Sequence, residues 1–238
     1  MAEGAAPSLA PGAWAGRLEV PSAVARAHGL ALALNASFFR AEAVEREGRK
    51  LAYVVGNGAT PVGWHVSGGQ VRSRPTAPRF RAALVVRTSG RVTVEPRLEE
   101  VPTDARCVVS GNALVLQGGE PVPSRDEARH PRSAVGLSAD GRTLLLVAVD
   151  GRQEHSRGAT LEELGRLLKD FGATDALNLD GGGSTAMAAR DPVTGVIAVL
   201  NRPSDLAPGL PDTRVERPVA DVLGIVLREP ASAPPRVP

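Results

Sequence analysis

A short apolar run that ends in an acid, three glycines and two hydroxyls is the stretch of this sequence best suited to chemistry. It spans residues 176–185 and reads Ala-Leu-Asn-Leu-Asp-Gly-Gly-Gly-Ser-Thr. The apolar residues predict a buried strand, and the glycines let the backbone adopt positive φ or approach a ligand closely. Asn178 and Asp180 share one face of such a strand, because side chains two residues apart point the same way. The pattern indicates either a catalytic corner at Asp180 or a tight glycine turn capped by that carboxylate.

Two common motifs that combine glycines with hydroxyls do not fit this stretch. A phosphate loop requires Gly-Lys-Ser/Thr, which does not follow the glycines. A nucleophile elbow requires Gly-x-Ser-x-Gly, whereas Ser184 is followed by Thr, Ala and Met. The partners of Asp180 must therefore come from elsewhere in the chain.

A predicted hairpin carries a second group of charged residues. Its two apolar strands are joined at Asp140-Gly141, a dipeptide typical of tight hairpin turns. His130 and Arg132 begin the first strand, and Asp150 and Arg152 follow the second, which returns antiparallel to the same end. Each charge alone fits a solvated strand end, but the topology brings all four together.

A helix is predicted between this hairpin and the apolar run before Asp180. Thr160 to Glu163 form a capping box, leucines then recur at helical spacing, and Gly172 ends the pattern. A helix that joins two strands is typical of a parallel crossover, in which both strands end at one edge of the sheet. The sequence therefore predicts Asp150 and Arg152 beside Asp180.

Two further features have both a structural and a functional interpretation. Asn35 follows a predicted strand and could serve a site or a turn, and Trp64 in a glycine-rich loop could stack on a sugar or cover the core. Residues 107–110 and 113–116 flank Gly111-Asn112 in a pattern that predicts another hairpin.

The composition bounds the class of protein. With 238 residues, 42% of them hydrophobic, the chain can bury one large core, so we expect a loose segment at 1–20, one domain at 21–229 and a disordered Pro-rich tail at 230–238. The 28 basic and 26 acidic residues are too balanced to indicate nucleic acid. Cys107 is the only cysteine, which excludes an intramolecular disulfide and a cysteine metal cluster.

No apolar run is long enough to span a bilayer. Residues 1–14 lack the basic start and apolar centre of a secretory signal. The sequence as it stands indicates a cytoplasmic protein, or an extracytoplasmic one if a signal was removed.

In their order along the chain, these pieces resemble the phosphodiester glycosidase domain family over roughly residues 30–227. The matching pieces are Asn35-Ala-Ser-Phe-Phe39, His130-Pro-Arg-Ser133, Asp150-Gly-Arg152, Gly158-Ala-Thr-Leu-Glu-Glu-Leu164, Asn178-Leu-Asp-Gly-Gly-Gly-Ser-Thr185, Asn201-Arg-Pro203 and Glu216-Arg-Pro218. The resemblance implies an α/β (α+β) fold with a mixed β-sheet and flanking helices. It also implies hydrolysis of a sugar 1-phosphodiester, such as an N-acetylglucosamine 1-phosphodiester, to free sugar and a phosphomonoester.

Such a reaction needs particular groups. The leaving phosphomonoester is a weak base, so arginines on the phosphate and a carboxylate near the anomeric carbon matter more than an acid. Arg132 and Arg152 are the phosphate-binding candidates, with Arg217 as a third. Asp180 is the candidate nucleophile, or the base that activates water. His130 could donate to the phosphate or act as an acid.

The remaining candidates complete the predicted site. Asp150 or Glu163 could supply a second carboxylate, although the capping box already explains Glu163. The side chains assigned to sugar hydroxyls or an amide are Asn35, Asn178 and Asn201, and the turn assigned to the substrate comprises Gly181, Gly182, Gly183, Ser184 and Thr185. No cofactor is required, but a divalent cation could sit between Asp150 and Asp180.

Two other classes of protein compete with this interpretation. A noncatalytic module for anionic glycans would use the same arginines without a placed carboxylate. A metal-dependent phosphodiesterase would break the P–O bond and should show histidines and aspartates at ligand spacing, whereas the four histidines are scattered.

Overall fold

The computed structural model describes residues 14–46 and 48–227, so residues 1–13 of the predicted loose segment and the predicted tail lie outside it. Strands hold 41% of the described residues and helices 11%. Every strand pairing in these ranges is antiparallel. The predicted mixed sheet is therefore wrong, and the fold is mostly β rather than a sheet flanked by helices.

The sheet that carries the site has five strands in the order β13-β12-β16-β14-β15. The bounds are β12 Ala113–Gln117, β13 Glu120–Pro121, β14 Arg132–Leu137, β15 Leu144–Val149 and β16 Asp175–Asn178. The chain does cross from β15 to β16 through helix α2, Leu161–Asp170, and the two strands run parallel. However, β14 lies between them, so the two strands do not pair with each other. The helix and the pairing of β14 with β15 were predicted correctly, but the expectation that β15 and β16 lie side by side was wrong.

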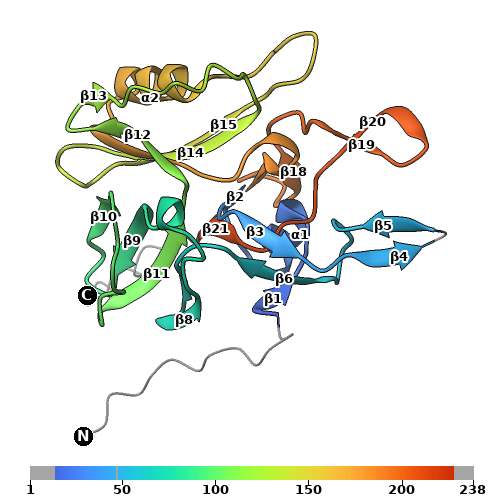
Figure 1. Ribbon diagram of the computed structural model, residues 1–238, viewed down its shortest axis with the longest axis horizontal. Coiled ribbons are helices and arrows are strands. Elements are labelled where there is room, and N and C mark those ends of the chain that lie inside the picture. The colour runs from blue at the N-terminus through green and yellow to red at the C-terminus, as the bar shows by residue number, and fades with distance from the viewer. Residues whose placement is uncertain (1–13, 47, 228–238) are drawn as a thin grey trace, which may run out of the picture.

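Helix α2 begins and ends as its sequence predicts. Thr160 and Glu163 form the capping box, and Gly172 follows the helix with a φ of 91°. Leu164 and Leu168 are fully buried against the sheet. Figure 1 shows α2 lying over one face of this sheet, while the remaining sheets lie below. Burial of each leucine stabilises the fold by about 1.5–3 kcal/mol.

The other strands form three further sheets and two separate hairpins. One four-stranded sheet contains β18 Ile197–Val199, β17 Met187–Arg190, β2 Leu32–Asn35 and β21 Val222–Ile225, and helix α1, Pro21–Ala27, contacts it. A five-stranded sheet contains β10 Val92–Glu95, β9 Ala83–Arg87, β11 Ala105–Ser110, β7 His65–Ser67 and β8 Gln70–Ser73. A three-stranded sheet contains β1 Gly16–Arg17, β6 Gly58–Pro61 and β3 Phe39–Ala41. The hairpins are β4 Val44–Arg46 with β5 Arg49–Leu51, and β19 Asp205–Ala207 with β20 Leu210–Val215.

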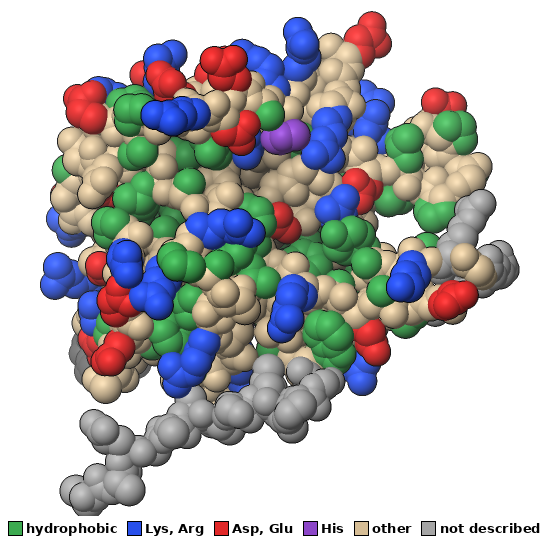
Figure 2. Space-filling view, in the orientation of Figure 1, with side chains coloured by type: hydrophobic (Ala, Val, Ile, Leu, Met, Phe, Trp, Pro, Cys, Tyr) green, Lys and Arg blue, Asp and Glu red, His purple; other side chains and the backbone are tan. Residues whose placement is uncertain are grey.

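Short 3₁₀ turns complete the structure at Pro78–Phe80 and Gly182–Ser184. Neither α1 nor α2 is long and apolar enough to cross a membrane, and no other helix in the described ranges is. The face seen in Figure 2 carries charges of both signs, in keeping with the near-balanced composition.

One apolar cluster joins the sheets around the site. Leu34 of β2, Leu84 of β9 and Leu177 of β16 are all fully buried and belong to it. Because three sheets bury their inner faces in this cluster, the ends of their strands are held at fixed positions relative to one another. The site lies where two of these sheets meet.

Candidate active site

A pocket of about 190 Å³ opens at the edge where β14 begins and β16 ends. It is lined by Phe38, Asn112, His130, Arg132, Arg152, Asp180, Gly181 and Gly182. The structure thus brings Arg132, Arg152 and Asp180 together, as the topology of the sequence predicted.

The register of the sheet explains why these residues meet. Strand β14 pairs antiparallel with both neighbours, Arg132 opposite Val149 and Ala134 opposite Asn178. The start of β14 therefore lies between the end of β15 and the end of β16. The residues that follow both neighbouring strands emerge beside Arg132.

The corner at Asp180 is held by hydrogen bonds from two sides. Its backbone N–H donates to the carbonyl of Ala36 at 2.9 Å, and its own carbonyl accepts from Asn35 Nδ2 at 2.6 Å. Its carboxylate oxygen Oδ1 accepts from the N–H of Gly181 at 2.9 Å. The position of the carboxylate is therefore fixed by the backbone around it.

Burial raises the pKa of Asp180 to about 6. The Ser184 side chain, the Gly181 N–H and the charge of Arg217 act in the opposite direction, and the negative charge of Asp221 adds to the rise. Ser184 Oγ lies near the carboxylate without hydrogen-bonding geometry, and both it and Thr185 Oγ1 are buried with no hydrogen-bond partner among the described residues. A carboxylate with this pKa is mostly ionised at neutral pH and is still basic enough to take up a proton.

Two glycines of the turn let arginines approach the corner. Gly182 has a φ of 61°, and a Cβ there would lie 3.1 Å from a guanidinium nitrogen of Arg152. A Cβ on Gly183 would lie 2.0 Å from Arg217 Nη2. Any side chain at either position would push a guanidinium away from the turn.

Arg132 is a buried cation without a carboxylate partner among the described residues. Its Nε donates to the carbonyl of Ala159 at 3.0 Å and its Nη2 to that of Ala128 at 3.1 Å. Burial and the neighbouring Arg152 lower the pKa of Arg132, against the charge of Asp126, but a guanidinium stays protonated at neutral pH. It therefore gives the pocket a positive charge that no ion pair within the described ranges neutralises.

Arg152 contributes a second positive charge to the pocket. Among the described residues it is the only non-glycine with positive φ, at 57°, a conformation that costs on the order of 1 kcal/mol or more. Its Nη2 lies 3.3 Å from His130 Nδ1. Because an arginine can only donate, His130 accepts at Nδ1 and carries its proton on Nε2.

The same surroundings keep His130 neutral. Burial lowers the pKa of His130, the charges of Arg132 and Arg152 lower it further, and Asp126 acts in the opposite direction. A neutral imidazole can donate a hydrogen bond from Nε2. It is poorly suited to the alternative role of a cationic acid at neutral pH.

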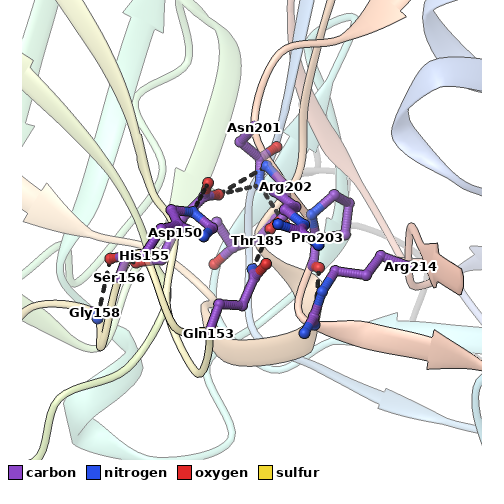
Figure 3. A network of polar contacts seen from close by, with 10 residues as sticks. All are labelled: Asp150, Gln153, His155, Ser156, Gly158, Thr185, Asn201, Arg202, Pro203 and Arg214. Carbon is purple, nitrogen blue, oxygen red and sulfur yellow. Dashed lines mark hydrogen bonds and ion pairs between the residues drawn. The ribbon is translucent and has the colours of Figure 1, made fainter. Parts of the chain in front are cut away.

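The carboxylate of Asp150 binds loop residues outside the pocket, as Figure 3 shows. Its Oδ1 accepts from the N–H of Arg202 at 2.8 Å and from Asn201 Nδ2 at 3.2 Å, and its Oδ2 lies 3.1 Å from His155 Nε2. Asn201 in turn accepts from the N–H of Met187 at 2.8 Å. Asp150 and Asn201 tie two loops together and do not line the pocket.

Glu163 also has its partners inside the fold. Its Oε2 accepts from the N–H of Thr160 at 2.9 Å, and it forms an ion pair with Arg129. The Thr160 N–H, together with the hydrogen bond and charge of Arg129, holds the pKa of Glu163 below its usual value, against the effect of burial. The structure gives Glu163 its capping role and does not place it at the pocket.

Asn35 and Asn178 lie next to the corner but do not line the pocket. Asn35 is fully buried, and its Oδ1 accepts from Ser133 Oγ at 2.6 Å and from the N–H of Ala186 at 3.1 Å. Asn178 Nδ2 donates to Asn112 Oδ1 at 2.7 Å. Both residues position the lining of the pocket rather than form it.

Arg217 already has a counter-ion. It makes two hydrogen bonds to Asp205, at 2.8 and 3.1 Å, and stacks over the ring of Tyr53 at 4.3 Å. It does not line the pocket, unlike the two arginines before it. Its charge reaches Asp180 through space only.

Sequence reasoning missed Phe38 and Asn112, which line the pocket. The predicted hairpin at Gly111-Asn112 is wrong, because β11 and β12 belong to different sheets. A Cβ on Gly111 would lie 2.0 Å from the carbonyl oxygen of Asn178. The glycine is there for close packing against β16, and that packing delivers Asn112 to the site.

Asp221 was also missed, although it lies next to the corner. It accepts from the N–H of Ser37 at 2.8 Å and forms an ion pair with His65 at 2.6 Å. Burial alone would raise the pKa of Asp221, but the His65 charge and the bonds from His65 and Ser37 hold it below its usual value. It therefore remains a buried carboxylate whose charge is used inside the protein.

No group of three His, Cys, Asp or Glu side chains suited to one metal ion occurs in residues 14–46 and 48–227. Of the two carboxylates considered for a cation, only Asp180 lines the pocket. The other, Asp150, is bound by the loop residues described above.

Comparison with known proteins adds a family and a fold. The sequence profile of the phosphodiester glycosidase family matches residues 28–226. The catalytic domain of zebrafish N-acetylglucosamine-1-phosphodiester alpha-N-acetylglucosaminidase, auto-inhibited by its pro-peptide, has a similar structure with a TM-score of 0.66. It is 24% identical, and the match covers 89% of this chain and 68% of that one.

Two other proteins are similar to this chain. A crystal structure from Burkholderia pseudomallei K96243 matches with a TM-score of 0.57 and 18% identity, over 92% of this chain and 70% of that one. The SPbeta prophage-derived uncharacterized protein YomE of Bacillus subtilis (strain 168) is 36% identical over 97 residues. That segment is 41% of this chain and 13% of YomE. At these identities the two structural likenesses show a shared fold.

Proposed function

The chain belongs to the phosphodiester glycosidase family, and we propose that it hydrolyses the glycosidic bond of a sugar 1-phosphodiester to free sugar and a phosphomonoester. The substrate would be of the N-acetylglucosamine 1-phosphodiester kind. The observation that carries the proposal is one carboxylate, Asp180, in a pocket with two arginines that have no carboxylate partner among the described residues.

The phosphodiester would lie against the arginines. Arg132 and Arg152 bind its two free oxygens, and His130 donates from Nε2 as a neutral group. Charge-assisted hydrogen bonds of this kind are roughly twice as strong as neutral ones. They also stabilise the charge that develops on the departing phosphomonoester, so the bond can break without a strong general acid.

Asp180 would act at the anomeric carbon, as nucleophile or as the base that activates water. Its pKa of about 6 supports either role, because the ionised form dominates at neutral pH while the basicity exceeds that of an ordinary aspartate. Neither role needs Asp150 or Glu163, which are held by other partners. The sugar would contact Phe38 and the Nδ2 of Asn112, whose Oδ1 already accepts from Asn178.

The test is hydrolysis of a panel of sugar 1-phosphodiesters in ¹⁸O-labelled water, with and without a chelator. We expect sugar release with the label in the sugar, and loss of release in Asp180→Asn. Label in the phosphomonoester, with activity lost to the chelator, would instead indicate a metal-dependent phosphodiesterase. Binding of the compounds without any release would indicate a noncatalytic glycan module.

A further inference from the structure

A second, larger hollow adjoins the Asp180 pocket and shares Arg152 with it. It has a volume of about 510 Å³ and is lined by Arg152, Gln153, Glu154, Arg157 and Arg214. Its walls come from the loop that follows β15 and from strand β20. On the face that Figure 2 shows, basic side chains gather beside the visible histidine. The two hollows are therefore neighbours joined by one guanidinium.

The lining of this hollow is cationic. Three arginines face one carboxylate, that of Glu154, and none of the three forms an ion pair among the described residues. Arg214 Nη1 donates to the carbonyl of Ser204 at 2.9 Å, which leaves most of its five N–H donors for a ligand. Such a set of planar, bidentate donors suits phosphate or carboxylate oxygens.

The walls are already ordered by hydrogen bonds. Gln153 Nε2 donates to the carbonyl of Arg202 at 2.7 Å, and Ser156 Oγ donates to that of Asp150 at 2.6 Å. Figure 3 shows Gln153 and Arg214 reaching the Arg202–Pro203 segment from different parts of the chain. These bonds hold the loop that carries Arg152 and Arg157, so a ligand would not have to order the loop backbone on binding.

The hollow lies where the aglycone of the proposed substrate would extend. If Arg132 and Arg152 hold the scissile phosphate and the sugar faces Phe38 and Asn112, the aglycone leaves the phosphate on the Arg152 side. From the proposed function, on which this step rests, we infer that the hollow binds a second anionic group on the aglycone. The preferred substrate is then a sugar 1-phosphodiester whose aglycone carries a further phosphate or carboxylate.

Three compounds of equal length test the inference. Each is an N-acetylglucosamine 1-phosphodiester of a propyl aglycone that ends in a hydroxyl, a carboxylate or a phosphate. We expect the protein to hydrolyse the two anionic compounds with a kcat/KM about 10- to 150-fold above the neutral one, mainly through a lower KM. The order of carboxylate and phosphate identifies which anion the hollow prefers.

Arg157→Glu removes one wall charge and adds an opposite one. We expect it to abolish the preference for the anionic aglycones while turnover of the neutral compound stays within about twofold. Arg166→Glu is the matched control, because Arg166 is an exposed arginine of α2 that pairs with Glu162 and does not line either hollow. Equal kcat/KM for all three compounds, or a preference that survives Arg157→Glu, would overturn the inference.

Binding separates this inference from the proposed function. Calorimetry on the Asp180→Asn protein measures the affinity of the same three compounds without turnover. Absence of hydrolysis in the wild-type protein would end the proposed function. If the anionic compounds still bound more tightly, and Arg157→Glu removed that difference, the hollow would stand as an anion site.

Discussion

Asp180 and Asp221 are two carboxylates taken out of water in the same part of the molecule, yet their pKa values move in opposite directions. Burial acts on both, but Asp221 has His65 at 2.6 Å, whereas Asp180 has no cation in direct contact among the described residues. The difference lies in the partner rather than in the depth of burial. The fold satisfies the charge of Asp221 internally and leaves that of Asp180 facing a pocket with two arginines that form no ion pair among the described residues. A substrate phosphate would complete that arrangement.

The largest effect should come from Asp180→Asn. The change keeps the size of the side chain but removes the charge that would attack carbon or activate water, so we expect turnover to fall by about 10³-fold or more. Binding of the phosphodiester should change little. Single-turnover kinetics and calorimetry measure the two quantities separately. Near-normal turnover in a folded variant would make Asp180 a turn-capping residue.

The same variant should not lose stability. The folded pKa of Asp180 lies above its unfolded value of 3.8, so its contribution to stability is full below pH 3.8 and is lost as the pH rises through about 6. We therefore expect Asp180→Asn to melt higher than the wild-type protein at pH 7–8 and the advantage to vanish near pH 4. A lower melting temperature at pH 8 would contradict this account.

Asp221→Asn, unlike Asp180→Asn, should destabilise the fold. It leaves His65 without its buried partner, and we expect a loss of about 3 kcal/mol, or roughly 6–12 °C in melting temperature. Asp212→Asn, at an exposed position of β20, is the matched control. A melting temperature within about 1 °C of wild type would show that the pair contributes nothing.

The pH dependence of that loss follows from the two partners. The lowered pKa of Asp221 gives stability above 3.8 that is lost as the pH falls through the folded pKa. Burial alone would lower the pKa of His65, but the hydrogen bond and charge of Asp221 raise it above its usual value of 6.5. The pair therefore stabilises the fold below pH 6.5, and this stability is lost as the pH rises through the folded pKa of His65. The difference in melting temperature between the wild-type protein and Asp221→Asn should therefore be largest between about pH 4 and pH 6.5.

Arg152→Ala tests the other half of the comparison, the charges left for the substrate. The guanidinium would touch the phosphate before and during bond cleavage, so both KM and kcat/KM should suffer. A loss of about 10- to 150-fold in affinity for a phosphodiester is expected. Arg142→Ala, at the far turn of the β14–β15 hairpin, should leave affinity unchanged. Equal affinities for the two variants would show that Arg152 does not bind the phosphate.

A smaller effect should appear in the pH profile of kcat/KM. If Asp180 must be ionised, the rate should rise about 10-fold between pH 5 and 8, with a midpoint near 6. His130 should add no acidic limb near neutrality, since its pKa is lowered by burial and by Arg132 and Arg152. A rate that falls over this range would assign Asp180 the role of an acid.

Features carried by neighbours in sequence were predictable. The capping box of α2, the hairpin of β14 and β15 and the turn after Asp180 each depend on residues within a few positions of one another. Together they were enough to bring Arg132, Arg152 and Asp180 to one edge.

Features that depend on distant pairing were not predictable. His65 and Asp221 are 156 positions apart, and nothing in the local pattern of either links them. Insertion of β14 between β15 and β16 turned an expected parallel pair into two antiparallel ones. Asn35 lies at the corner, as predicted, but its side-chain oxygen accepts hydrogen bonds from Ser133 and Ala186, which are 98 and 151 positions away.

Glu163 offers the smallest and sharpest comparison, because it was a catalytic candidate and the structure places it with Asp221 as a carboxylate used internally. Gln can replace Glu in a capping box, so Glu163→Gln should keep the bond to the Thr160 N–H and lose only the exposed ion pair with Arg129. Exposed pairs contribute about 0–1 kcal/mol, so stability should change by less than about 1 kcal/mol and turnover by less than about twofold.

Glu163→Ala removes the reciprocal bond as well and should cost about 1 kcal/mol, still without loss of turnover. Denaturant unfolding and steady-state kinetics on both variants measure this directly. If folded Glu163→Gln instead turned over substrate about 100-fold more slowly or worse, Glu163 would return to the reaction, and the loop before α2 would have to move toward the pocket when substrate binds.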